Sequence, residues 1–181
     1  MKYAIACVFN GGLEKYHKSL ANEIAKEFGL TVVKKQNLPT HLTLKYPFNL
    51  KNIKKLEEKI EKFAYGNRKA KIKVGGFGFF GKDVAYLKIN NSFNAGRLIS
   101  KLIKELKTIK NLDWTNVDAE NLVPHCTLVI GCNKKFKSIK RFLQNKEKYF
   151  NVYMDNLTIF KLVSKKRKIH KWKIYKKFSL N

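Results

Sequence analysis

Two short stretches carry the residues best suited to chemistry in this sequence. They are His41-Leu42-Thr43-Leu44 and His125-Cys126-Thr127-Leu128, and both have the pattern His-x-Thr-Leu. The chain has four His, seven Thr and nineteen Leu in 181 residues, so two such matches would arise by chance in about one sequence in ten thousand. We therefore interpret the two histidines as a functional pair.

Paired His and Thr side chains suit chemistry at a phosphoester. With an ordinary pKa of about 6.5, one imidazole can accept a proton while the other donates one. The hydroxyls of Thr43 and Thr127 can donate hydrogen bonds to phosphate oxygens, and Lys45 can add positive charge nearby. The sequence has neither a carboxylate cluster for two metal ions nor a Gly-x-Ser-x-Gly nucleophile elbow. We expect no metal site and no cofactor.

Each motif opens an apolar run that is typical of a β-strand. Because a strand sends alternate side chains to opposite faces, His41, Thr43 and Lys45 are expected on one face. His125 and Thr127 are likewise expected to share a face, with the motif leucines opposite. If the leucines face the core, the two His/Thr faces can meet across a cleft.

Hydrophobic periodicity predicts the elements that position these motifs. Apolar residues at intervals of three and four indicate helices, with Gly29 as a C-cap of the first and Asn91-Ser92 as an N-cap of the third. Alternating or continuous apolar runs indicate strands, and the glycines at 75–81 indicate a bulge or tight bend. The expected helices span about 13–28, 53–63, 93–109 and 136–143; the expected strands are 3–9, 31–33, 69–74, 83–89, 150–163 and 169–178, with a turn at 164–168.

The order of these elements repeats within the chain. A strand, a helix, a motif strand and a helix occur early, and the same order returns from residue 83, with the motifs 84 residues apart. The prediction is an α+β fold that is bilobal, with two pseudo-symmetric antiparallel sheets, outer helices and a central cleft. Residues 1–181 are expected to form one two-lobed domain.

The charge of the chain indicates an anionic partner. Lys and Arg number 39 against 13 Asp and Glu, a formal net charge of +26. Residues 134–181 hold sixteen of these basic residues, interleaved with Trp172 and Tyr175, as in surfaces that bind single-stranded RNA. The alternative is a lysine-rich composition that only keeps the protein soluble. Phe80 is a candidate for stacking on a base, although packing in the core is the plainer interpretation.

Other residues set the context. Cys7, Cys126 and Cys132 have no metal-ligand spacing, and together with the lack of a secretory signal they indicate reduced thiols in a cytoplasmic protein. No run of eighteen apolar residues is present, so no membrane span is expected. We expect a monomer. His17 flanks the apolar stripe of the first helix and is expected at its boundary.

The paired motifs, their spacing and the alternation of helices and strands resemble the two-histidine (2H) phosphoesterase superfamily, which includes 2′-5′ RNA ligase-like proteins and RNA cyclic phosphodiesterases. The resemblance implies hydrolysis of 2′,3′-cyclic or related phosphoesters without a metal. It implies that His41 and His125 are the catalytic pair, as acid and base respectively, and that Thr43 and Thr127 bind phosphate. Lys45-Tyr46-Pro47-Phe48 stands where the best-known RNA ligase-like branch commonly has Phe-Gly. The subgroup therefore stays open.

Three functions are consistent with these observations. The first is a metal-independent phosphodiesterase acting on cyclic phosphates of RNA ends or nucleotides, with 2′-5′ RNA ligase activity as a related option. The second is a basic module of the same fold that binds RNA without turnover. The third is a phosphoesterase with a substrate other than RNA. Two proton-transfer groups favour an enzyme over a binding module, because binding alone does not require them.

Overall fold

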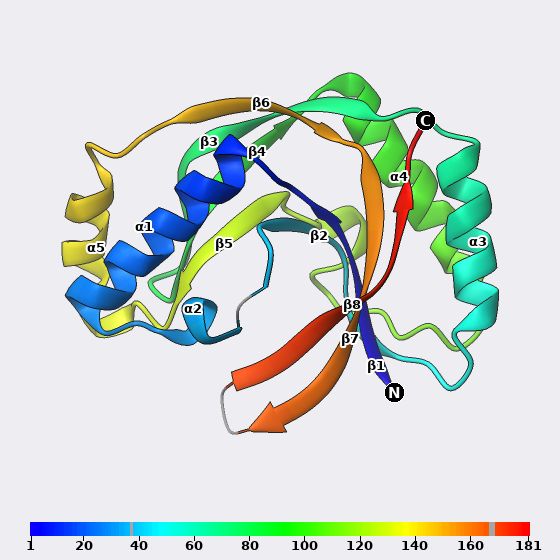
Figure 1. Cartoon of the computed structure of the whole chain (residues 1–181), viewed down its shortest axis with the longest axis horizontal. Helices are drawn as coiled ribbons and strands as arrows, with labels where there is room; N and C mark the ends of the chain where they lie inside the picture. Colours follow the sequence, from blue (N-terminus) through cyan, green and yellow to red (C-terminus); the bar gives the residue numbers. More distant parts are fainter. Residues whose placement is uncertain (37, 167–168) are drawn as a thin grey trace.

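Two four-stranded antiparallel sheets form the frame of the molecule in the computed structural model, which describes residues 1–36, 38–166 and 169–181 (Figure 1). The first sheet has the order β2-β1-β7-β8, and the second has the order β5-β4-β3-β6. The first comprises β2 (His41–Asn49), β1 (Lys2–Val8), β7 (Asn156–Lys166) and β8 (Ile169–Ser179); the second comprises β5 (His125–Ile130), β4 (Val84–Asn91), β3 (Ala70–Phe80) and β6 (Tyr149–Met154).

The two sheets repeat one connection. Strand β1 leads through helix α1 (Gly12–Phe28) to the motif strand β2, and β4 leads through α4 (Phe93–Lys107) to the motif strand β5. Each motif strand lies antiparallel to the strand that begins its unit, at the edge of its sheet, and β2 contacts β5. The predicted pair of similar lobes is confirmed.

The predicted helices are also confirmed, and two of the expected caps are present. Gly29 has φ 67°, in the left-handed region, and its N–H donates to the Ala25 carbonyl. The Ser92 hydroxyl accepts the Ala95 N–H at 3.2 Å. The remaining helices of the described residues are α2 (Val32–Gln36), α3 (Lys54–Tyr65) and α5 (Phe136–Leu143), with short 3-10 turns at Ala119–Asn121 and Asn133–Lys135. Within the described ranges, no helix combines the length and apolar character needed to cross a bilayer.

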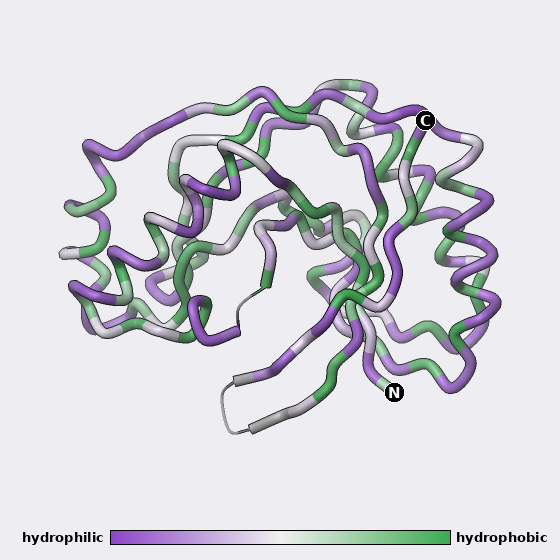
Figure 2. The backbone as a smooth tube through the Cα atoms, viewed as in Figure 1, coloured by the Kyte–Doolittle hydropathy of each residue, from purple (hydrophilic) through white to green (hydrophobic). Residues whose placement is uncertain are grey.

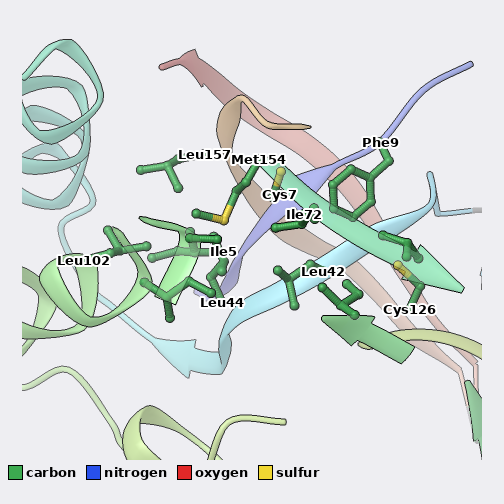
Figure 3. Packing of buried hydrophobic residues seen from close by; sticks show 14 of the residues in the cluster. Ile5, Cys7, Phe9, Leu42, Leu44, Ile72, Leu102, Cys126, Met154 and Leu157 are labelled. Carbon is green, nitrogen blue, oxygen red and sulfur yellow. The ribbon is translucent and has the colours of Figure 1, made fainter. Parts of the chain in front are cut away.

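The hydrophobic core lies between the two sheets and the helices. Figure 2 shows hydrophobic stretches along the central strands and mainly hydrophilic colour along α3 and the outer loops. In Figure 3, Leu42 and Leu44 from the first motif gather with Ile5, Ile72 and Leu102. Leu128 of the second motif is buried in the same core. The motif leucines therefore anchor their strands from the core side, as the alternation predicts.

Two predicted strands were wrong. Residues 31–33 are not a strand, because α2 begins at Val32. The run 150–163 is two strands, β6 and β7, which belong to different sheets and are separated by Asp155. The amide of Asn156 binds both the N–H and the carbonyl of Val8, at 3.1 and 2.8 Å, and so starts the pairing of β7 with β1. Periodicity along a chain cannot reveal such a change of partner.

The glycine-rich stretch of β3 contains the expected irregularity, and the last expected turn lies partly within β7. A β-bulge between Val74 and Phe77 interrupts the pairing of β3 with β4, and Gly75 and Gly76 both have positive φ, so the predicted bulge is confirmed. Of the predicted turn at 164–168, residues 164–166 belong to β7. Residues 167 and 168 lie outside the described residues.

Candidate active site

The two motif histidines are held in the same way. The Nδ1–H of His41 donates to the carbonyl of Pro39 at 2.7 Å, and that of His125 donates to the carbonyl of Val123 at 2.7 Å. Because a carbonyl only accepts, both Nδ1 atoms carry a proton, and the neutral ring has its lone pair on Nε2. Within the described residues neither Nε2 has a hydrogen-bond partner. Each ring is therefore fixed through Nδ1, and its Nε2 is the nitrogen that can accept or donate a proton.

Burial sets the proton affinity of both rings. Burial lowers the pKa of His41 below 6.5, the Pro39 carbonyl partly offsets this, and the charge of His125 lowers it further. Burial also lowers the pKa of His125, against the opposing effect of the Val123 carbonyl. The electrostatic effect of one histidine on the other supports their placement in one site. Each ring therefore gives up a proton more readily than a solvent-exposed histidine.

The motif threonines lie on the same strand faces as the histidines. Thr43 and Thr127 are partly exposed, while the leucine after each of them is buried. Neither hydroxyl has a recorded hydrogen-bond partner among the described residues. A small cavity of about 100 Å³ is lined by His41 of one motif and Thr127 of the other, so the structure brings the two motifs together. A larger groove of about 1090 Å³ lies elsewhere, between 49–59 and 108–113.

Aromatic rings flank both histidines. The ring of Phe80 meets His125 edge to face, with centroids 4.9 Å apart, and Tyr86 lies 5.0 Å from the same ring. On the other motif, Phe160 lies 5.5 Å from His41. Phe80 is 36% exposed, so its place beside a histidine and partly open to solvent suits the predicted contact with a substrate. The role itself stays a prediction.

Sequence reasoning missed Tyr86, although a signal was present. The apolar alternation of the strand places Ala85 and Leu87 in the core, which puts Tyr86 and Lys88 on the opposite face. What the sequence lacks is the register, in which Tyr86 pairs with Thr127 and Lys88 pairs with His125.

The prediction that Lys45 lies near the substrate phosphate was wrong. Its side chain is fully buried, and its Nζ donates to Asp118 Oδ2 at 2.8 Å. The cause is a β-bulge: Ala6 pairs with Thr43 and Ile5 pairs with Lys45, which leaves Leu44 as an extra residue. The bulge turns Lys45 away from the face of His41 and into the interior.

Asp118 is matched to this buried lysine. Its carboxylate also accepts the N–H of Tyr46 at 2.8 Å and both the N–H and hydroxyl of Thr115, at 2.9 and 2.8 Å. Burial would raise the pKa of Asp118, but the hydrogen bonds from Lys45 and these other donors lower it below 3.8. The pair fixes the loop before β5 to the strand of the first motif.

His17 was expected at the boundary of the apolar stripe of α1, and this was also wrong, because its side chain is buried. Its side chain is 6% exposed, and Nε2 lies 2.8 Å from the backbone carbonyl of Thr127. Burial lowers the pKa of His17 to about 4, against the opposing effect of the Thr127 carbonyl, so the ring is neutral at pH 7 and its Nε2–H donates. His17 thereby ties α1 to the second motif strand.

The aromatic residues of the basic C-terminal strand have structural partners. Trp172 packs against the buried cluster of Ala6, Val8 and Phe160, and the Tyr175 hydroxyl donates to Glu57 at 2.7 Å. Their predicted contact with RNA stays untested.

The thiols are free and buried at Cys7, Cys126 and Cys132, and burial raises the pKa of Cys7 to about 12. Among the described residues, no three His, Cys, Asp or Glu side chains are grouped as potential metal ligands.

Comparison with known proteins adds a family and a fold. A model of the 2′-5′ RNA ligase superfamily matches residues 13–165. TT0787 of Thermus thermophilus has a similar structure, with a TM-score of 0.71 and 15% identity over 99% of this chain and 98% of that one. E. coli LigT in complex with 3′-AMP gives a TM-score of 0.61 and 15% identity, over 99% and 97% of the two chains. LigT in complex with NADP+ gives 0.65 and 14%, with the same coverage. No curated protein sequence matches the chain.

Proposed function

This chain belongs to the 2′-5′ RNA ligase superfamily, and from that premise we propose that it hydrolyses 2′,3′-cyclic phosphates on RNA ends or nucleotides. The observation that carries the proposal is the matched pair of histidines, both fixed through Nδ1 and both without a hydrogen-bond partner at Nε2 among the described residues. A site that only binds phosphate has no need for two rings in matched tautomers. Both lobes contribute, so residues 1–181 act as one two-lobed unit.

In the proposed reaction the two rings have opposite tasks. His125 Nε2 takes a proton from water while the water oxygen forms a bond to phosphorus. The bond from phosphorus to one ribose oxygen breaks in line, and His41 Nε2 donates its proton to that oxygen. One water is added in total, and the product is a phosphomonoester beside a free ribose hydroxyl. The rings return to their starting state when His125 releases a proton to solvent and His41 takes one up.

The threonines stabilise the charge that develops on the phosphate. Among the residues that the structure describes, the hydroxyls of Thr43 and Thr127 have no hydrogen-bond partner, so each can donate to a non-bridging oxygen. Because Lys45 is neutralised by Asp118, the site depends on these hydroxyls and on the protonated histidine for that stabilisation. Phe80, edge-on to His125, stacks on the base next to the phosphate.

The direct test is hydrolysis of a 2′,3′-cyclic nucleotide and of an RNA oligomer with a cyclic end, in EDTA. We expect a phosphomonoester product from the wild-type protein. His41→Ala and His125→Ala should each lower kcat by about 10²- to 10⁴-fold, since each removes one proton-transfer group. His170→Ala, on β8, is the matched control and should keep the wild-type rate.

The other outcomes are equally informative. Circular dichroism and thermal denaturation of each variant establish that it is folded. Wild-type rates in both folded histidine variants would refute the mechanism. Binding of the RNA oligomer without any product would identify a binding module instead. Product from neither RNA nor nucleotide, with turnover of another phosphodiester, would identify a non-RNA substrate.

A further inference from the structure

Within the described part of the chain, one face of the second sheet has no hydrophobic cover. The strand registers place this face opposite the core residues Ile72, Val74 and Leu87. Its side chains combine lysines with aromatic rings, and we call it the open face: Lys71, Lys73, Tyr86, Lys88, Tyr149, Asn151 and Tyr153. Apart from Tyr86, all of these are exposed to solvent. His125 and Thr127 lie on this same face, at the β5 edge.

A single row across the sheet joins His125 to a tyrosine. His125 pairs with Lys88, the glycine bulge follows on β3, and Gly75 pairs with Tyr149 on β6, the far edge strand in Figure 1. The ring of Tyr149 lies over these glycines, since a Cβ on Gly76 would meet its hydroxyl at 3.2 Å. The glycines therefore leave room for a half-exposed ring in the row that begins at His125.

Two of the tyrosines on the open face lie next to lysine ammonium groups. Lys73 Nζ lies 4.7 Å from the centroid of Tyr149, and Lys69 Nζ lies 5.7 Å from that of Tyr153. The one recorded acidic contact among the described residues of this face is at the edge, where the Tyr149 hydroxyl donates to Glu147 at 3.2 Å. Half-exposed tyrosines next to lysines are what a single-stranded nucleic acid requires, because bases stack on the rings and phosphates pair with the ammonium groups.

We infer that the open face holds the single-stranded RNA that precedes the cyclic phosphate, so that the substrate is an oligonucleotide end. Tyr149 lies three strand spacings from His125, roughly 14 Å. One nucleotide with its phosphate between the histidines cannot also cover Tyr149, whereas the preceding nucleotides of a chain can. The position of the phosphate between the histidines rests on the proposed function. The binding of the preceding nucleotides rests on the residues of the open face alone.

The test measures a variant without the Tyr149 ring on two substrates, an RNA oligomer and a mononucleotide. Tyr149→Ala should raise KM for an RNA oligomer with a 2′,3′-cyclic end by about tenfold, with little change in kcat. The KM for a 2′,3′-cyclic mononucleotide should stay at the wild-type value. Tyr149→Phe keeps the ring and should behave as wild type. Tyr65→Ala is the control, because it removes another exposed tyrosine, on α3 and away from the open face. Equal losses on both substrates, or none on either, would overturn the inference.

Binding separates this inference from the proposed function. A fluorescent RNA oligomer with a 3′-phosphate is titrated with each protein and followed by anisotropy. We expect about tenfold weaker binding for Tyr149→Ala alone. If that loss is seen but no cyclic phosphate is hydrolysed, the RNA site stands and the phosphodiesterase proposal fails. If all variants bind alike while hydrolysis proceeds, the phosphodiesterase stands and the RNA site is refuted.

Discussion

At the scale of single residues, the environment of the two histidines determines the pH at which they work. Both pKa values lie below 6.5, chiefly because the rings are buried. The proposed acid must be protonated and the proposed base neutral, which is best met between the two pKa values. The most active form of the free enzyme therefore exists below pH 6.5.

The first prediction is a pH profile. The kcat/KM for a cyclic nucleotide should peak below pH 6.5 and fall by about tenfold per unit on the alkaline side, as the acid loses its proton. Initial rates between about pH 4.5 and 8.5 measure this directly, in buffers of constant ionic strength. A profile that is flat, or that rises from pH 6 to pH 8, would contradict the assigned roles.

The same scale shows what the sequence can reveal about the site. The residue types of His41, Thr43, His125 and Thr127 can be found from their repeated spacing alone. The hydrogen bond from His17 to the strand of Thr127 links residues 110 positions apart, and no local pattern marks it. Tyr86 and Tyr149 join the site only through strand register, which is a property of the folded sheet.

At the scale of elements, one extra residue changes the role of a side chain. Strict alternation would have kept Lys45 with His41 and Thr43, and the bulge at Leu44 moves it into the core. Its partner Asp118 comes from a loop 73 residues later. A buried charge can remain only where such a partner is available, because desolvation of an unpaired ion is costly.

The second prediction concerns this ion pair. Asp118→Asn leaves the Lys45 charge buried and unpaired, and should lower the free energy of unfolding by about 3 kcal/mol or more. Combining it with Lys45→Met removes both charges and should recover much of the loss. Denaturant unfolding followed by circular dichroism measures all the variants.

The surface pair between Lys18 and Glu14, at 2.7 Å, supplies the control for the ion pair. Lys18→Met should cost less than about 1 kcal/mol, because water screens an exposed pair. If Asp118→Asn were equally mild, Lys45 would not depend on Asp118 for its place in the core.

At the scale of the whole molecule, the periodicity of the chain predicted the class of fold but not how the sheets are assembled. The helices around Leu20 and Leu102 and the motif strands follow from local patterns. The two lobes are not the two halves of the sequence, since β7 and β8 return to complete the sheet that β1 and β2 begin. Apolar strands such as β7 pair equally well with many partners, so the choice depends on the packing of the complete chain.

The third prediction follows from the net charge of +26. RNA binding should weaken with salt, and three phosphate contacts by Lys71, Lys73 and Lys88 would give a slope of log K against log salt of about −2. Lys73→Gln should make the slope less steep by about 0.7. Lys101 is exposed on α4, and Lys101→Gln should leave the slope unchanged. Anisotropy titrations at several salt concentrations measure this, and a slope near zero would mean that the charge does not serve RNA binding.

The bridge from Asn156 to Val8 has a consequence for the order of events during translation. Val8 on β1 pairs with His41 on β2, which carries the first histidine. The other neighbour of β1 is β7, and its Asn156 follows Val8 by 148 residues in the chain. A ribosome will have made both motifs before it reaches β7, and domains take shape as their segments emerge. The nascent chain can therefore display all four motif residues and still lack a finished first sheet. Catalytic competence should arise late, with the strands that follow Asp155.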